Sequence, residues 1–192
     1  MANDNKVIFF DFYGVIWYDG LLKYLRDHGL TFSGEIRTSD RARCAGKITK
    51  QQHLDNLAKA TGHSGDYIYN YMISINRPDD KVVEILAKLK NQGYKLALLT
   101  NCSESILGRI KNGQLRQYFD DMILSYKVGV TKPDLRIYEL ALQKLGISAD
   151  EAIFIDDKSE NTDAAEKLGI KSILFTSAAD LVVKLSKLGV KI

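Results

Sequence analysis

Four short runs of mainly apolar residues constrain the fold of this chain more than any other feature of its sequence. Each is four residues long, and the first three are followed directly by a polar residue. Such short, nearly continuous apolar runs are typical of strands that are buried on both faces, as in a parallel sheet. The runs cover residues 7–10, 96–99, 152–155 and 172–175, with a weaker fifth at 122–124.

Helical patterns separate the later runs. Apolar residues recur there at spacings of three and four, which places them on one face of a helix. Gly93, Gly146, Gly169 and Gly189 stand where these helices should end, because glycine adopts the left-handed conformation at little cost. Alternation of strand and helix from about residue 80 predicts an open α/β sheet. The predicted buried helix faces are Val82, Ile85, Leu86 and Leu89; Ile137, Leu140, Ala141 and Leu145; and Leu181, Leu185 and Leu188.

The stretch after the first run breaks this alternation. Residues 17–78 contain no convincing strand, and Thr49 followed by Gln52 forms a capping-box pattern at the start of a helix. We therefore predict a helical insertion, folded over the sheet, between the first and second strands.

Composition argues against several classes of protein. The 192 residues carry a net charge of +3, and the lysines are interleaved with acidic and apolar residues, so we predict no nucleic-acid partner. The two cysteines and three histidines lack the spacing of a zinc site or a disulfide framework. The polar N-terminus and the shortness of the apolar runs predict a cytoplasmic protein without a signal peptide or membrane span. The sequence does not indicate an oligomeric state.

Polar side chains stand where the predicted strands end. Asp11, Thr100, Asp156 and Asp157 follow apolar runs, and Lys132 comes shortly after the weak fifth run. Taken singly, such residues are typical of turns or helix N-caps. Ligands of a parallel sheet bind outside the carboxyl ends of its strands, so together these residues predict a functional site.

The charges of this set favour a metal ion. Three carboxylates within a few Å of one another cannot all stay ionised unless cations neutralise them. One Mg²⁺ together with Lys132 would balance them, and Mg²⁺ prefers carboxylates, waters and phosphate oxygens. Asp11 can attack phosphorus as a nucleophile, while Thr100 and Lys132 can bind the transferring phosphoryl group.

Four segments carry a resemblance to a known family. They are Val-Ile-Phe-Phe-Asp-Phe-Tyr-Gly-Val-Ile at 7–16, Leu-Leu-Thr-Asn at 98–101, Lys-Pro-Asp at 132–134 and Phe-Ile-Asp-Asp-Lys-Ser-Glu-Asn at 154–161. In order and interval they resemble the four signature motifs of the haloacid dehalogenase superfamily. The resemblance implies a Rossmann-like core, residues 1–16 and 79–192, and a helical cap, residues 17–78, that closes over the active site and selects the substrate.

The resemblance also implies roles for single residues. Asp11 would be the nucleophile, and Thr100 and Lys132 the other catalytic groups. Asn101 and Tyr13 are the predicted substrate-binding residues, with a turn role as the alternative for Asn101. The implied substrate is a small phosphorylated molecule.

The same resemblance implies the ligands of Mg²⁺. They would be the Asp11 carboxylate, the Tyr13 backbone carbonyl and Asp157. Asp156 would bind the ion through a water molecule, or would support the direct ligands without contacting the ion itself.

One residue departs from the family pattern. Family phosphatases carry Asp-x-Asp, and their second aspartate protonates the leaving oxygen and then activates water. Here that position is Tyr13. Tyrosine ionises at pH ~10, and loss of general acid–base help typically costs about 10²–10⁴-fold in rate. We therefore predict weakened phosphatase activity.

Two alternatives remain open. An Asp-x-Tyr-Gly start also resembles the 2-haloacid dehalogenase branch, which uses no metal; Arg37, Arg41 or Arg43 would then bind the substrate carboxylate or the halide. That branch lacks the double acid at 156–157, and without a metal the site would repel an anionic substrate. The other alternative is a degenerate binding or regulatory protein.

Several further residues have two alternative predicted roles each. Trp17, Tyr18 and the tyrosine-rich segment at 67–71 either line a pocket under the cap or form its core. Cys102 is expected near the pocket rim, either with a pKa lowered by a helix N-terminus or as an inert small residue. Asn161 either orients the loop after Asp157 or caps the following helix.

Overall fold

The centre of the computed structural model, which describes residues 6–111 and 114–192, is a five-stranded sheet. Its strands are β1 (Val7–Phe10), β2 (Lys95–Thr100), β3 (Asp121–Leu124), β4 (Ala152–Asp156) and β5 (Lys171–Leu174). They lie in the order β3-β2-β1-β4-β5, and every pair is parallel. The predicted α/β class and all five predicted strands are therefore confirmed.

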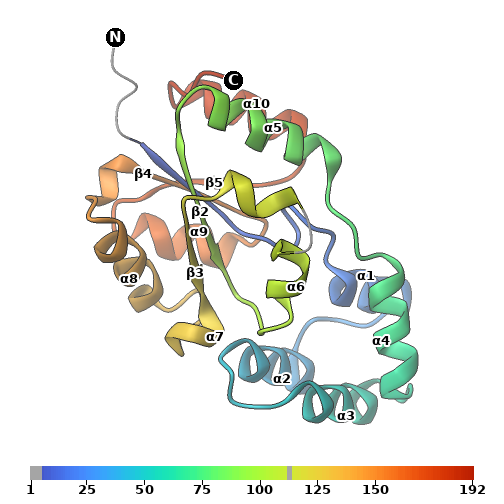
Figure 1. Ribbon diagram of the computed structural model, residues 1–192. Helices are drawn as coiled ribbons and strands as arrows, with labels where there is room; N and C mark the ends of the chain where they lie inside the picture. The colour runs from blue at the N-terminus through green and yellow to red at the C-terminus, as the bar shows by residue number, and fades with distance from the viewer. Residues whose placement is uncertain (1–5, 112–113) are drawn as a thin grey trace.

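Helices cover both faces of the sheet. They are α5 (Asp80–Asn91) and α10 (Ala178–Lys187) on one face, and α8 (Leu135–Leu145) and α9 (Ser159–Glu166) on the other. Side chains alternate along each strand, so Ile8 and Phe10 pack toward α5 and α10, whereas Val7 and Phe9 pack toward α8 and α9. Figure 1 shows α5 and α10 together at the top and α8 at the left. These helices cover the two faces of the sheet, and the strand ends lie outside them.

Most predicted helix faces are confirmed, but one member of the α8 face is wrong. Leu140 is 38% exposed, and Tyr138 is buried in its place. The Tyr138 ring packs edge-on against Phe154, and its hydroxyl donates a hydrogen bond of 2.8 Å to the backbone oxygen of Asn161. A tyrosine with a partner for its hydroxyl can be fully buried, so the buried face of α8 contains Tyr138 instead of Leu140. The four predicted glycine stops all have positive φ.

Short elements complete this part of the chain. They are α6 (Ile106–Lys111), α7 (Ser125–Val128) and the 3₁₀ turns η1 (Gln114–Tyr118) and η2 (Ala149–Glu151).

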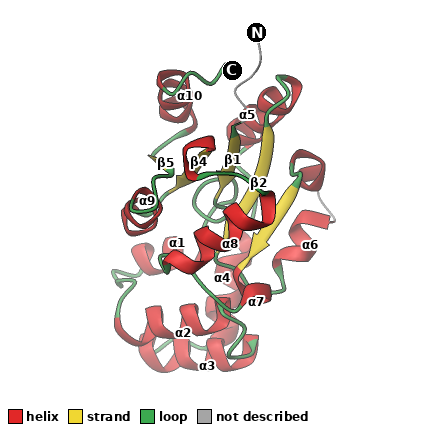
Figure 2. Ribbon diagram, turned by 90° about the vertical axis from the view of Figure 1, so that its left-hand side faces the viewer, coloured by secondary structure: helices red, strands yellow, loops and turns green. Residues whose placement is uncertain are grey.

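Four helices between β1 and α5 form a layer of their own. They are α1 (Gly20–Asp27), α2 (Gly34–Cys44), α3 (Lys50–Thr61) and α4 (Gly65–Ser74), and we call them the cap. The cap has a separate apolar cluster, whose fully buried members include Tyr24, Leu57 and Ile68. The predicted capping box of Thr49 and Gln52 is present at the start of α3. In Figures 1 and 2 the cap lies beyond the ends toward which the strand arrows point.

The chain passes between core and cap twice, and the two crossings lie side by side. The Tyr18 amide donates to the Arg77 carbonyl at 3.1 Å, and the Asp79 amide donates to the Ile16 carbonyl at 2.8 Å. These bonds lie next to the limits 17–78 that we propose for the cap.

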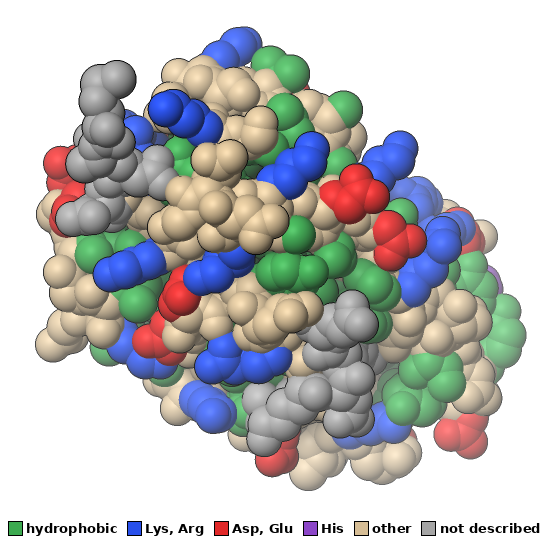
Figure 3. All heavy atoms as spheres, turned by 45° about the horizontal axis from the view of Figure 1, so that its top comes forward, with side chains coloured by type: hydrophobic (Ala, Val, Ile, Leu, Met, Phe, Trp, Pro, Cys, Tyr) green, Lys and Arg blue, Asp and Glu red, His purple; other side chains and the backbone are tan. Residues whose placement is uncertain are grey.

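The surface is mixed in charge. On the face shown in Figure 3, lysine and arginine side chains are scattered among apolar and neutral groups rather than gathered in one strip. Among the described residues, no helix combines the length and apolar character needed to cross a bilayer.

Candidate active site

Three aspartates meet where β1 and β4 end. Asp11 follows β1, Asp156 is the last residue of β4, and Asp157 comes next in the chain. One carboxylate oxygen from each lies within 4.8 Å of the others. The neighbouring positions of β1 and β4 in the sheet produce this cluster, because both strands end at the same edge.

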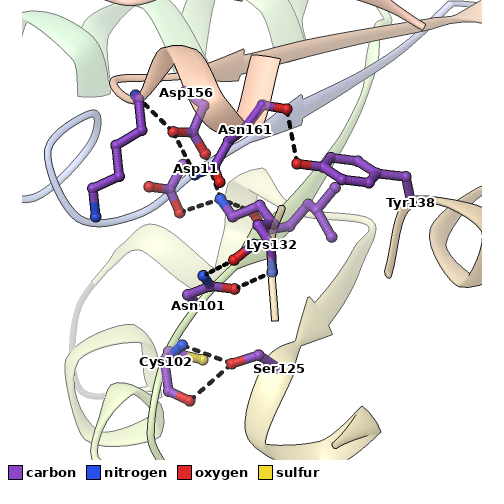
Figure 4. Close-up of polar contacts among 10 residues, drawn as sticks. Asp11, Asn101, Cys102, Ser125, Lys132, Tyr138, Asp156 and Asn161 are labelled. Atoms are coloured by element: carbon purple, nitrogen blue, oxygen red, sulfur yellow. Dashed lines mark hydrogen bonds and ion pairs between the residues drawn. The ribbon is translucent and has the colours of Figure 1, made fainter. Parts of the chain in front are cut away.

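Lys132 joins two of these carboxylates. Its ammonium lies 2.8 Å from Asp11 Oδ1 and 2.5 Å from Asp156 Oδ2, and it donates to the Leu99 carbonyl at 2.8 Å. Figure 4 shows Lys132 between the two aspartates. Burial lowers the pKa of Lys132, but the charges of Asp11 and Asp156 more than offset this, so the pKa lies above its ordinary value. Lys132 is therefore a permanent cation in a site with only 1% of its side chain exposed.

Asp156 and Asp157 have different surroundings, although they are neighbours in sequence. Asp156 Oδ1 accepts 2.9 Å hydrogen bonds from the Lys158 amide and the Asn161 side chain. Asp157 Oδ1 is buried and has no hydrogen-bond partner among the described residues. Burial, followed by the charge of Asp11, raises the pKa of Asp157 to about 7. Asp157 therefore lacks the protein contacts that satisfy Asp156.

Gly14 leaves room for the Asp157 carboxylate. A Cβ on Gly14 would lie 2.3 Å from Asp157 Oδ2, and the φ of Gly14 is +87°. Only glycine tolerates both the close approach and this backbone conformation. The loop after Asp11 is thus shaped around Asp157.

These residues fit a divalent cation. The three carboxylates have one cationic partner, Lys132, within salt-bridge distance among the described residues, and Asp157 keeps an unpartnered oxygen. A hard cation with oxygen ligands such as Mg²⁺ suits this donor set. The residues that would hold it are Asp11, Asp157 and the Tyr13 carbonyl, with Asp156 already held by Asn161 and Lys158. These ligand roles remain our proposal.

The remaining predicted groups border the same site. Thr100 ends β2 and is fully buried, and its hydroxyl has no partner within the described residues. Asn101 is used differently: its side chain donates to the Lys132 carbonyl at 2.9 Å and accepts from the Lys132 amide at 2.8 Å. Both of its polar atoms therefore hold the backbone of Lys132, and a direct substrate contact would compete with these bonds.

A cavity of about 190 Å³ lies between this site and the cap. Asp11, Tyr13 and Lys132 line its floor, and all four cap helices contribute to its walls. Tyr69 is the member of the 67–71 segment that faces it, whereas Trp17 and Tyr18 do not line it. The predicted position of the cap over the site therefore agrees with the structure.

Cap and core are linked by an ion-pair cluster. Arg37 and Arg41 on α2 both pair with Glu160 on α9, Arg41 at 3.2 Å. Both arginines were candidates for binding a substrate anion, and each already has an anionic partner. Arg43, the third candidate, lines the cavity.

Cys102 lies beside the site but is not a reactive thiol. It is 1% exposed, and burial, followed by the charge of Asp11, raises its pKa to about 12. Its amide donates to Ser125, whose hydroxyl donates in turn to the Cys44 carbonyl at 2.6 Å. Cys102 thus belongs to a contact between core and cap.

Sequence reasoning missed five charged residues in the cavity wall: Asp19, Asp40, Lys50, Lys158 and Glu160. Burial, followed by the charge of Asp19, raises the pKa of Asp40 to about 6. Lys158 stands within the fourth predicted motif and could have been found there. No spacing in the cap sequence singles out Asp19 or Asp40, because the tertiary fold of the cap brings them to the site.

Comparisons with known proteins agree with this architecture. The solved structure of a HAD family enzyme from Bacteroides thetaiotaomicron, in complex with magnesium and inorganic phosphate, superposes with a TM-score of 0.66 at 22% identity, over 89% of this chain and 94% of that one. At this identity the likeness concerns the fold alone.

Curated relatives include both phosphatases and dehalogenases. The sesquiterpene phosphatase astK of Aspergillus oryzae is 30% identical over 147 residues, which cover 74% of this chain and 75% of that protein. The (S)-2-haloacid dehalogenase of Pseudomonas sp. (strain YL) is 37% identical over 93 residues, 48% of this chain and 40% of that protein. The family described as haloacid dehalogenase-like hydrolase matches residues 19–175. Fold, motif order and this match together place the chain in the haloacid dehalogenase-like hydrolase family.

Proposed function

We propose that the protein is a Mg²⁺-dependent phosphatase that acts on a small phosphorylated molecule through an aspartyl-phosphate on Asp11. The observation that carries this proposal is the surplus of carboxylates: Asp11, Asp156 and Asp157 cluster around Lys132 as their salt-bridge partner, and a buried oxygen of Asp157 is unpartnered among the described residues. A metal-free reaction would have to bring an anionic substrate to this excess of negative charge. A divalent cation removes that obstacle.

The residues of the site suggest how phosphate is transferred. Lys132 holds the Asp11 carboxylate by its 2.8 Å contact, which leaves the other carboxylate oxygen for attack on phosphorus. The new bond joins Asp11 to phosphorus as the bond to the leaving alkoxide breaks, and water then releases phosphate from Asp11. The free Thr100 hydroxyl and Lys132 can bind the phosphoryl oxygens. Bound Mg²⁺ would add positive charge that attracts the phosphate group and stabilises its transfer.

Tyr13 limits this mechanism. The departing alkoxide needs a proton, and the attacking water must lose one. Tyr13 lines the cavity where a second aspartate is expected. A phenol is a poor base at neutral pH, so esters with poor leaving groups should react slowly.

The experiment is a panel of phosphate esters and 2-haloacids, assayed with Mg²⁺ and with EDTA. We expect phosphate release only with Mg²⁺, fastest for nitrophenyl phosphate, and no halide release. Asp11→Asn serves as the control, because an amide cannot act as the nucleophile. Metal-free halide release that depends on Asp11 would contradict the proposal.

Dehalogenation remains the second candidate, and two observations favour it. Tyr13 follows the dehalogenase-like Asp-x-Tyr-Gly pattern, and Arg43, a candidate for binding a substrate carboxylate, lines the cavity. The halide arm of the panel tests this candidate directly. A protein with neither activity would support the binding or regulatory reading.

Mg²⁺ should also stabilise the fold. A ligand that binds only the native state at 100 times its Kd adds about 2.7 kcal/mol, which corresponds to roughly 5–10 °C in Tm for a chain of this size. Asp157→Asn should remove most of this shift, because it removes the unpartnered carboxylate. Asp163→Asn, an exposed change on α9, is the matched control and should keep it. An unchanged Tm of the wild-type protein in millimolar Mg²⁺ would argue against a metal site.

A further inference from the structure

The cap side of the active-site cavity presents a group of apolar side chains beside the charged residues of the cavity. Six side chains contribute to it from α1, α3, α4 and the segment before α2. They are Leu21, Phe32, Leu54, Tyr69, Met72 and Ile73. Leu21 and Leu54 are also buried in the apolar cluster of the cap, so the packing of the cap fixes their positions.

Most polar groups of the same cavity are already bonded to the protein. Asp19 accepts the Leu22 amide at 3.0 Å at the start of α1, and Asn76 accepts the indole N–H of Trp17 at 3.0 Å. Ser103 and Ser105 bond to each other at 2.9 Å. With Asn101 held by Lys132 and Arg41 by Glu160, the lining groups left to bind sugar hydroxyls are Asn161 Oδ1, which has no partner among the described residues, and the charged side chains of the wall.

The other charges of the wall offset one another. The positive charges of Lys158, Arg43 and Arg41 act on the Asp40 carboxylate, and Lys158 also faces Asp19. Because positive and negative side chains lie together in this wall, the wall does not favour a leaving group that carries a charge. Lys50, a further lysine of the wall, lies 3.3 Å from the centroid of the Tyr69 ring, and the other apolar side chains are left to contact a ligand.

From this arrangement we propose that the cavity selects the phosphate monoester of a compact, uncharged apolar alcohol over a sugar phosphate. The inference rests on the proposed phosphatase function, and the reaction converts the ester and water into the alcohol and inorganic phosphate. Methylene groups that enter an apolar pocket each improve specificity by about 10-fold or more, whereas an added hydroxyl lowers it by at most about 10²-fold. The cavity of about 190 Å³ limits the alcohol to a small ring or a short chain.

Matched pairs of esters test the proposal in the Mg²⁺-loaded protein. Cyclohexylmethyl phosphate is compared with glucose 6-phosphate, and propyl phosphate with glycerol 3-phosphate, because each pair has a similar carbon frame with and without hydroxyls. We expect kcat/KM to favour the apolar ester by about 10–10²-fold in both pairs. Equal or higher kcat/KM for the hydroxylated esters would overturn the proposal.

A variant pair ties this preference to the cavity wall. Ile73 lies near the end of α4 and is 41% exposed, so Ile73→Asn should fold. We expect it to lower the apolar-to-sugar ratio of kcat/KM by about 10-fold, the effect of removing one good apolar contact. Val183→Asn, at a 53% exposed position on α10, is the control and should keep the wild-type ratio. An unchanged ratio in Ile73→Asn would contradict the assignment.

Binding of the product alcohols separates this inference from the proposed function. By calorimetry, cyclohexylmethanol should bind at least about 10-fold more tightly than glucose, and Ile73→Asn should reduce the difference. If no ester is hydrolysed but this binding holds, the phosphatase assignment fails and the apolar site stands. If esters are hydrolysed without any preference for apolar alcohols in rate or binding, the apolar site fails alone.

Discussion

Replacing Lys132 with methionine should lower the free energy of unfolding by about 3–5 kcal/mol and abolish turnover. Methionine fills a similar volume but leaves Asp11 and Asp156 buried without their cation. Burial already raises the pKa of Asp156, and the Lys132 ammonium opposes this rise, so its loss makes the ionised pair costlier still. Urea unfolding at neutral pH measures the change.

Lys144→Met is the matched control. Lys144 also pairs with an aspartate, Asp121 at 2.6 Å, but half of its side chain is exposed. Exposed pairs are worth below about 1 kcal/mol, so this change should cost little. If both variants lose the same stability, the buried pairs of Lys132 do not hold the site together as we infer. Added Mg²⁺ should recover part of the loss in Lys132→Met, because it neutralises the same carboxylates.

Changing Tyr13 to aspartate should raise the hydrolysis of esters with poor leaving groups by about 10-fold or more, a cautious part of the general acid–base range. The new carboxyl can protonate the leaving alkoxide and then activate water. Nitrophenyl phosphate needs little protonation in the first step and should gain less. Steady-state rates on an alkyl phosphate and on nitrophenyl phosphate, measured side by side, give the comparison.

Two further variants test the Tyr13 prediction. Asp11→Asn should be inactive in either background, because the nucleophile is lost. Tyr13→Phe removes the hydroxyl without adding a carboxyl and should not gain activity. If Tyr13→Asp folds and binds Mg²⁺ but hydrolyses no ester faster, the tyrosine marks a different reaction, or a core that no longer catalyses one.

The candidate site residues of the core could be predicted because they lie next to the strands in the sequence. Asp11, Thr100 and Asp156 adjoin apolar runs, and parallel strands bring their ends to one edge whatever the rest of the chain does. Leu140 shows where such reasoning fails. Its spacing predicts that Leu140 is buried, but Tyr138 is buried instead. The Tyr138 hydroxyl donates a hydrogen bond to the backbone carbonyl of Asn161, 23 positions away in the sequence.

The helices of the cap could be predicted from the sequence, but the side chains that the cap places against the core and the cavity could not. Its helices follow from periodicity and caps such as Thr49, yet the pairing of Arg37 with Glu160 joins positions 123 apart. Asp40 reaches the cavity through the packing of α2 on its neighbours. These contacts depend on how two layers meet, and no local pattern in the sequence carries that information.

The paired crossings between core and cap have a consequence for how this architecture can vary. Because Ile16 and Asp79 are joined by a 2.8 Å backbone bond, the inserted segment begins and ends at one point of the core. A closed segment of this kind can change length at low entropic cost, roughly 0.6 kcal/mol for each doubling. The cap over the clustered aspartates can therefore be enlarged, trimmed or rebuilt while the strand register beneath it stays intact, so the lining of the cavity and the aspartate cluster can change independently.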